Sequence, residues 1–151
     1  MADVTLRPAK AEDAPGVAAC VCEAYVHYIE RIGKQPGPML EDYADVISQF
    51  HVHVAAAVSG VVGAIVLKVT DEGFYVDNVA VRPSVKGQGI GRLLLELAET
   101  EASRQGFKTI YLATHELMTE NRALYSRIGY VEYDHRVVDG YARVFLRKAL
   151  P

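Results

Sequence analysis

The chain has 151 residues, of which 50% are hydrophobic and 23% charged, with a formal net charge of −3. This length and composition predict a single domain over residues 1–151 that buries a full core without a metal or disulfide bonds. The charge balance gives no general reason to bind nucleic acid or a membrane surface. The sequence has no apolar run of membrane-spanning length, and its first residues lack a signal-peptide pattern, so we expect a cytoplasmic location.

The first half of the chain predicts one strand, two helices and then three antiparallel strands. An acid followed by Pro15 is typical of a helix start, and apolar residues recur at helical spacing as far as about Gly33. Turn signals at Gly60 and Gly73 separate the three strands. The expected elements are a strand over 4–7, helices over 12–33 and 39–49, and strands over 51–58, 61–69 and 74–81.

The second half predicts a crossover helix followed by a final hairpin. From Ile90, apolar residues fall on one face of an amphipathic helix that should end at Gly106. Asp139 and Gly140 are typical of a two-residue hairpin turn. The expected elements are helices over 90–106 and 119–128, and strands over 109–113, 130–138 and 141–147. This order predicts an α+β domain in which residues 81–109 form the one parallel crossover.

The cysteines and histidines predict no metal site. Cys20 and Cys22 lie two residues apart in a predicted helix, so their side chains diverge and form neither a bridge nor a ligand pair. His51 and His53 share one face of a predicted strand, a spacing that can hold a metal, but no third ligand accompanies them. We therefore expect reduced thiols, solvated histidines and no metal.

A glycine-rich turn with the sequence Lys-Gly-Gln-Gly-Ile-Gly-Arg occupies residues 86–92, between a predicted strand and the amphipathic helix. Alternating glycines let the backbone approach a ligand, and the helix start offers unpaired N–H groups at the positive end of the helix dipole. The turn therefore predicts a phosphate site, with a purely structural tight turn as the alternative. The spacing matches neither a dinucleotide fingerprint nor a P-loop, which excludes both of those nucleotide sites.

Together with Val79-Ala80-Val81 before it, this turn resembles the acetyl-CoA signature of the GNAT superfamily of N-acetyltransferases. The core of that signature is Arg or Gln, two residues, Gly, one residue, and Gly or Ala. Lys86 stands in the first position, which keeps the charge but loses bidentate phosphate geometry. A second block, residues 120–130, is similar to the family's segment of an Asn, a helix carrying a Tyr, and a terminal Gly-aromatic pair.

The resemblance implies a fold, a reaction and a cosubstrate. The implied fold is a mixed, mostly antiparallel sheet of about seven strands, splayed between the fourth and fifth and flanked by about four helices. The implied reaction moves an acetyl group from acetyl-CoA to a primary amine by direct attack in a ternary complex, without a metal. The implied cofactor-binding residues are Val79, Ala80, Val81, Lys86, Gly87, Gln88, Gly89, Ile90, Gly91, Arg92, Asn121 and Tyr125.

Three implied groups would carry the chemistry. The Val79 N–H would polarise the acetyl carbonyl, while the Val81 backbone binds the pantetheine arm. Tyr125 would act as a hydrogen-bond donor that protonates the leaving sulfur late, because a tyrosine pKa of ~10 exceeds a thiol pKa of ~8.5. Asp77, two residues before Val79 and so expected on the same strand face, could accept the amine proton. Other candidates for the base are Glu72, Tyr75, His115 and Glu116.

Each of these residues also has a purely structural interpretation. Tyr125 could be a core tyrosine, Asp77 a solvated strand acid, and Asn121 a helix cap.

A non-catalytic acetyl-CoA sensor and a protein-interaction module with a structural glycine turn are the alternative functions. A homodimer through the last strands is a further prediction.

The acceptor site implied by the family lies over the first two helices and the final hairpin, which here are acidic and rich in tyrosine. Such a rim would attract a small cationic amine, whereas acidic helix faces can also be merely solvated. The acceptor could be a small molecule or a peptide. The candidate substrate-binding residues are Tyr25, Tyr28, Asp77 and His115, and the other rim residues are Glu30, Glu41, Asp42, Tyr43, Asp134 and Asp139.

Overall fold

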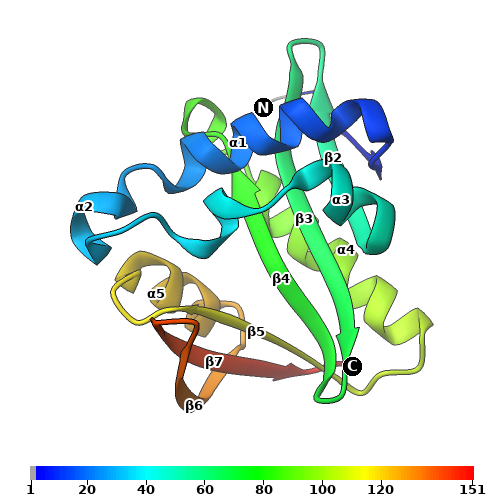
Figure 1. Cartoon of the computed structure of the whole chain (residues 1–151). Helices are drawn as coiled ribbons and strands as arrows, with labels where there is room; N and C mark the ends of the chain where they lie inside the picture. The colour runs from blue at the N-terminus through cyan, green and yellow to red at the C-terminus, as the bar shows by residue number, and fades with distance from the viewer. Residues whose placement is uncertain (1–2) are drawn as a thin grey trace.

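The computed structural model describes residues 3–151, and its seven strands form one sheet of order β1-β2-β3-β4-β5-β7-β6 (Figure 1). This arrangement confirms the predicted α+β class and the mixed sheet. The strands are β1 (Thr5–Pro8), β2 (His51–Ala57), β3 (Gly60–Thr70), β4 (Gly73–Val81), β5 (Thr109–His115), β6 (Val131–Val138) and β7 (Tyr141–Ala149). The α-helices are α1 (Ala14–Tyr25), α2 (Tyr28–Ile32), α3 (Tyr43–Gln49), α4 (Ile90–Arg104) and α5 (Thr119–Arg127), and the 3₁₀ helices are η1 (Ala11–Asp13), η2 (Gly37–Leu40) and η3 (Pro83–Val85).

Helices cover both faces of the sheet, with α1 and α3 on one face and α4 on the other (Figure 1). Successive strand residues point to opposite faces, so β2, β3 and β4 each supply both hydrophobic clusters. On the α4 face Leu67 packs with Leu94, and on the α1 face Val66 and Ala80 pack with Val21. None of the helices in residues 3–151 is long and apolar enough to cross a membrane.

The first predicted helix divides into η1, α1 and α2, which raises the number of α-helices to five. After α1 ends, the Ile29 N–H bonds to the Val26 carbonyl at 3.2 Å, a three-residue step in place of the four-residue helical ladder. Tyr28 lies within this tighter turn, and its hydroxyl donates to Glu120 at the start of α5. The break between α1 and α2 therefore coincides with a tertiary contact, and the hydrophobic periodicity of the sequence gives no sign of it.

Two other element boundaries differ from the predicted ones because of local partners. The helix expected from residue 39 begins at Tyr43, since the Asp42 side chain accepts the Ala44 N–H at 3.1 Å and caps α3. β5 continues beyond residue 113 as far as His115, because β7 pairs with it up to Arg143.

β4 and β5 are parallel neighbours whose paired register covers three residues of β4 and ends at Val76. The next residue, Asp77, is a β-bulge, since Val76 and Asn78 lie opposite consecutive residues of β3. A bulge bends and twists its strand. β4 therefore turns away from β5 after Val76, as Figure 1 shows. This divergence confirms the predicted splay and opens the sheet beside α5.

The final hairpin places β7 inside the sheet, paired with both β5 and β6, and leaves β6 at the edge. Val131 and Val137 of β6 are 66% and 76% exposed. Of the last two strands, only an edge strand has free backbone groups for another chain. A homodimer through the last strands would therefore have to use β6.

Candidate active site

Two cavities meet where β4 leaves β5. One lies on the α1 face between the 32–38 loop and the strands; we call it the sheet cavity, and its lining includes Ile32, Pro36, Asp77, His115, Tyr141 and Arg143. The other lies between the end of α1, the start of α4 and α5; we call it the helix cleft, and its lining includes Tyr28, Val81, Lys86, Gly91 and Leu124. Four residues line both: Tyr25, Val79, Asn121 and Tyr125.

The backbone of Val79 faces the gap between β4 and β5. The Arg82 N–H bonds to the Val62 carbonyl of β3 at 2.9 Å, which sets the hydrogen-bonded pairs between the two strands. Such pairs alternate along an antiparallel ladder. Val79 is three residues from Arg82 and therefore falls in a non-hydrogen-bonded pair with Ile65 of β3. Its N–H and C=O point away from β3, toward the gap. The Tyr25 hydroxyl donates to that carbonyl at 3.1 Å, and the neighbouring N–H is directed to the junction of the cavities.

A buried polar network holds this stretch of β4. The Tyr25 hydroxyl also lies 3.0 Å from Asn78 Oδ1, and Asn78 Nδ2 donates to the Tyr43 hydroxyl at 3.0 Å. Tyr43 in turn donates to the Pro38 carbonyl at 2.6 Å. Burial raises the pKa values of both tyrosines, so they remain neutral donors. Asn78 was not among the residues expected at the site, although a side-chain amide with a buried position in the strand pattern was the available signal.

Tyr125 is both a core residue and a lining residue of the two cavities. It is 7% exposed, and its ring meets Tyr130 edge-on at 5.8 Å between centroids. Burial raises the pKa of its hydroxyl, with smaller contributions from Tyr28 and Tyr75, so the group stays protonated at neutral pH. The structural interpretation therefore holds, and the functional role of Tyr125 stays a prediction that its position at both cavities allows.

Asp77 does not share a strand face with Val79, which makes that expectation wrong. The bulge adds one residue and shifts the alternation of side chains. Val79 packs against the cluster on the α4 face, whereas the Asp77 Oδ2 lies 3.5 Å from Lys68 Nζ. Lys68 is two residues from Val66, which belongs to the α1-face cluster. Asp77 still lines the sheet cavity and can meet a ligand there.

The glycine turn borders the helix cleft and fits a phosphate-bearing ligand such as acetyl-CoA. Gly87 and Gly89 have φ values of 84° and 81°, and a Cβ at either position would meet nothing within 4 Å. Gly89 is the N-cap of α4 and supplies no side chain to its first N–H groups. Those groups are oriented for an anion in the open space before them. The Ile90 side chain, 2% exposed, belongs to the core and contributes only backbone here.

The three bases around this turn have different roles. Lys86 is exposed and lines the helix cleft. Arg82 forms an ion pair with Glu23 of α1, and Arg92 lies 3.4 Å from Glu96 one helical turn away. Lys86 is therefore the one of these three side chains that is placed to meet a phosphate.

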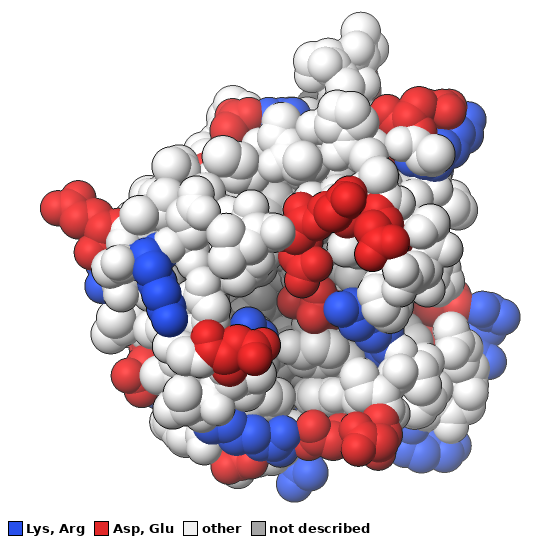
Figure 2. Space-filling model, in the orientation of Figure 1, with Lys and Arg blue, Asp and Glu red and all other residues white. Residues whose placement is uncertain are grey.

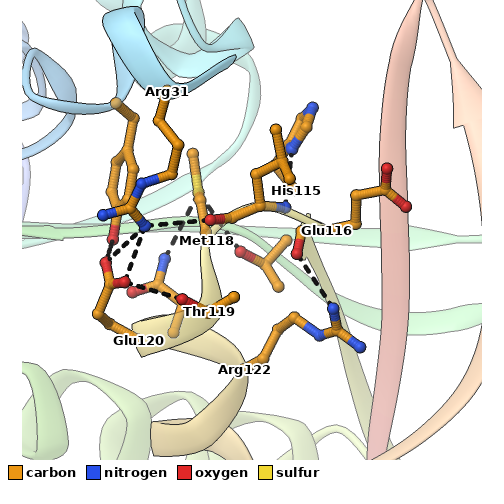
Figure 3. Close-up of polar contacts among 11 residues, drawn as sticks. Arg31, His115, Glu116, Met118, Thr119, Glu120 and Arg122 are labelled. Atoms are coloured by element: carbon orange, nitrogen blue, oxygen red, sulfur yellow. Dashed lines mark hydrogen bonds and ion pairs between the residues drawn. The ribbon is translucent and has the colours of Figure 1, made fainter.

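Polar contacts fasten α2 to the start of α5 above the helix cleft (Figure 3). Arg31 Nη1 lies 2.7 Å from Glu120 Oε1 and also donates to the Leu117 carbonyl at 3.1 Å. Tyr28, which lines the cleft, donates to Glu120 Oε2 at 2.9 Å. The hydrogen bond from Arg31 is the largest of the contacts that lower the pKa of Glu120 to about 2. Glu120 thus remains ionised as the centre of the contact.

Asn121 and His115 line the cavities, whereas His51 and His53, the histidine pair considered above as metal ligands, do not. Asn121 is the third residue of α5 and so does not cap the helix; its Nδ2 lies 3.6 Å from Met118 Sδ. His115 accepts the Leu117 N–H at Nδ1 in the sheet cavity. His51 and His53 lie together in β2, with ring centroids 4.8 Å apart. Residues 3–151 contain no group of three side chains suited to a metal.

Apart from Asp77, none of the acids of the expected rim lines either cavity. Figure 2 shows acidic side chains gathered over η2 and the start of α3, and they extend to the edge of the hollow beside the 32–38 loop. Of the predicted rim residues, Tyr25 lines both cavities and Tyr28 the helix cleft. The predicted acids that line neither cavity are the rim residues Glu30, Glu41, Asp42, Asp134 and Asp139 and the base candidates Glu72 and Glu116.

Comparison with known proteins identifies a family. Residues 48–132 match the family model described as an acetyltransferase (GNAT) domain. A mycothiol acetyltransferase of Jonesia denitrificans is 32% identical over 92 residues, which are 58% of this chain and 29% of that protein. The chain therefore corresponds to under a third of the length of that curated relative.

Solved structures share the fold over almost the whole chain. The PaiA N-acetyltransferase of Thermoplasma acidophilum, in complex with coenzyme A, superimposes with a TM-score of 0.82 at 19% identity, covering 97% of this chain and 99% of that one. A GNAT family acetyltransferase of Elizabethkingia anophelis with acetyl-CoA bound gives 0.75 at 20% identity, covering 97% and 98%. At these identities the likeness concerns the fold alone.

Proposed function

Because the chain belongs to the acetyltransferase (GNAT) family, we propose that residues 1–151 act as one domain that transfers an acetyl group from acetyl-CoA to a primary amine. The observation that carries this proposal is the meeting of the sheet cavity and the helix cleft at Val79 and Tyr125. Ligands that enter from the two sides can be oriented against each other there, which is the main requirement for a reaction in a ternary complex.

In this proposal the helix cleft holds acetyl-CoA, which supplies an acetyl group activated as a thioester. The N–H groups at the start of α4 and the Lys86 ammonium bind its pyrophosphate. The backbone from Val79 to Val81 and the Asn121 side chain hold its arm. The sheet cavity is left for the amine, and Tyr25, Asp77 and His115 are the predicted substrate residues that line it.

Each catalytic group has one task in the proposed reaction, in which a nitrogen–carbon bond forms and the thioester carbon–sulfur bond breaks. The Val79 N–H stabilises negative charge on the acetyl oxygen. Asp77 accepts, directly or through water, the proton that the amine loses. Tyr125 donates a hydrogen bond to the departing sulfur and protonates it late; burial keeps the hydroxyl protonated and so able to donate that bond.

The proposed function is tested by a melting shift and a panel of amines. Acetyl-CoA at a hundred times its Kd should add ~2.7 kcal/mol of stability, which for this chain length raises Tm by roughly 5 to 10 °C. Thiol release with at least one amine among polyamines, amino sugars, dipeptides and amino acids should accompany the shift. A shift without thiol release would indicate a non-catalytic acetyl-CoA sensor, and no shift would indicate an interaction module.

We further propose a cytoplasmic location and pairing of two copies through the exposed edge of β6. The exposed valines of that strand support the choice of edge.

A further inference from the structure

Arg143 brings a cationic group into the sheet cavity. It lies opposite His115 in the β5–β7 register, so both side chains project from the α1 face of the sheet. A Cβ added at Gly37 would lie 3.3 Å from Arg143 Nη2, so the guanidinium reaches up to the 32–38 loop. The guanidinium centre lies 5.9 Å from the Tyr141 ring. Within residues 3–151 no carboxylate lies within ion-pair distance of Arg143, although ion pairs engage several other arginines.

The charges around the sheet cavity are separated by sign. Lys34 Nζ donates to the Gly140 carbonyl at 2.8 Å and lies 4.0 Å from the Tyr141 ring, which places a second cation near Arg143. The negative group of the cavity is Asp77, beside Lys68 on β4 and β3. Asp77 adjoins the junction of the cavities, where the amine would react.

The titration of neighbouring groups agrees with this arrangement. Burial, followed by the Asp77 carboxylate, raises the pKa of Tyr75 to about 12, and Arg143 opposes that rise. The pKa of Tyr75 therefore responds to both Asp77 and Arg143. Burial lowers the pKa of His115, Glu116 opposes this, and Arg143 and Lys34 lower it further. His115 is therefore neutral at pH 7 and, with Nδ1 accepting a backbone N–H, can present Nε2–H as a donor.

We propose that the acceptor amine carries a carboxylate, and that Arg143 binds this carboxylate in the sheet cavity. The proposal rests on the acetyl transfer proposed above and names its substrate class. A guanidinium matches a carboxylate with two parallel hydrogen bonds, and a partly enclosed guanidinium without a counter-ion gains most from such a partner. A purely cationic amine would face repulsion from Arg143 and Lys34.

The remaining lining defines the rest of the acceptor. Ile32, Pro36, Met118 and the Tyr141 ring present apolar surface around the sheet cavity. The complementary ligand is therefore an amino acid with an apolar side chain, its amine toward Asp77 and its carboxylate toward Arg143.

The test compares each amino acid with its own carboxamide, which keeps the amine and side chain but lacks the charge. The substrates are leucine and phenylalanine with leucinamide and phenylalaninamide, and kcat/KM is measured by thiol release. Wild-type protein should prefer the acids by tenfold or more. Arg143→Met should lower kcat/KM for the acids by roughly ten- to a hundredfold, as expected for a lost charge-assisted pair, and change it little for the amides.

Arg147→Met is the matched control. Arg147 lies on the same strand and the same face, four residues from Arg143, over the Tyr133 ring and outside both cavities. This variant should keep the wild-type preference. An equal or higher kcat/KM for the amides in wild-type protein would overturn the inference, as would an Arg143→Met variant that still prefers the acids.

Failure of the inference differs from failure of the acetyl transfer. If wild-type protein acetylates amines but ignores the carboxylate, the reaction stands and the role of Arg143 falls. If no amine releases thiol, the reaction falls, and calorimetry on the wild-type protein saturated with CoA decides the inference. Tighter binding of phenylalanine than of phenylalaninamide supports it; equal binding or none overturns it. If the Arg143→Met variant does not fold, the same calorimetric comparison on the wild-type protein decides the inference.

Discussion

Single residues at the junction do two jobs at once. Tyr125 packs edge-on against Tyr130 in the core and also lines both cavities. Tyr25 buries its ring and uses its hydroxyl to hold the Val79 carbonyl. Since the same side chains support the fold and form the site, a substitution there has to separate the two contributions.

We expect Tyr125→Phe to lower kcat by at most 10² to 10⁴, the range of general-acid catalysis, because the ring is kept while the donor to the sulfur is lost. Steady-state rates checked under conditions where chemistry is limiting give the measurement. Tyr130→Phe is the control, since its buried hydroxyl has no partner within residues 3–151; it should keep both kcat and Tm. An undiminished kcat in Tyr125→Phe would remove the residue from the chemistry.

Elements are joined to one another by contacts that the sequence pattern does not contain. The bulge in β4 separates it from β5, and the Glu120 contacts hold α2 over α5. At the N-terminal end, Arg7 of β1 and Asp13 of η1 form an ion pair at 2.7 Å that fastens the first strand to the start of α1.

The contact between Arg7 and Asp13 makes the stability of the fold depend on pH in the acidic range. The hydrogen bond from Arg7 is the largest cause that lowers the pKa of Asp13, from 3.8 to about 2. The folded pKa lies below the unfolded one, so the contribution of Asp13 is complete above about pH 4 and is lost as pH falls to about 2. Asp13→Asn should lower Tm at pH 7 and flatten the fall of Tm between pH 4 and 2.

Thermal unfolding followed by circular dichroism at several pH values measures this dependence. Glu12→Gln, the exposed neighbouring acid, should reproduce the wild-type curve. An Asp13→Asn curve parallel to that of wild-type protein would show that the pair does not contribute.

At the scale of the whole molecule, two cavities opening on one junction favour direct transfer over an acetylated enzyme. Cys20 lies beneath β4, with Sγ 3.9 Å from the Ala80 carbonyl, and burial raises its pKa to about 11. Its thiol is therefore protonated at neutral pH and unreactive. Cys22 is exposed and lines neither cavity.

Initial rates measured over both substrates should therefore give intersecting double-reciprocal lines. The intact mass of the protein should not change after incubation with acetyl-CoA alone. Parallel lines together with a gain of one acetyl group would contradict the ternary complex and point to a covalent route.

The sequence by itself determined the order of the elements, the glycine turn and the helix that carries Tyr125. These features are local: hydrophobic periodicity indicates a helix or a strand within one segment, and glycine is the residue type that permits the φ near 80° of Gly87 and Gly89. The α+β class and the parallel crossover followed from that order, because few topologies connect such a series of elements.

Only the tertiary structure decided which side chains meet. The bulge at Asp77 depends on how β4 pairs with β3, and one added residue moved the carboxylate to the other face. Arg82 forms an ion pair with Glu23 on α1. Arg143 lies beneath the 32–38 loop, which is more than a hundred residues earlier in the chain. Register and contacts between distant segments are set by packing of the whole chain, and no local pattern records them.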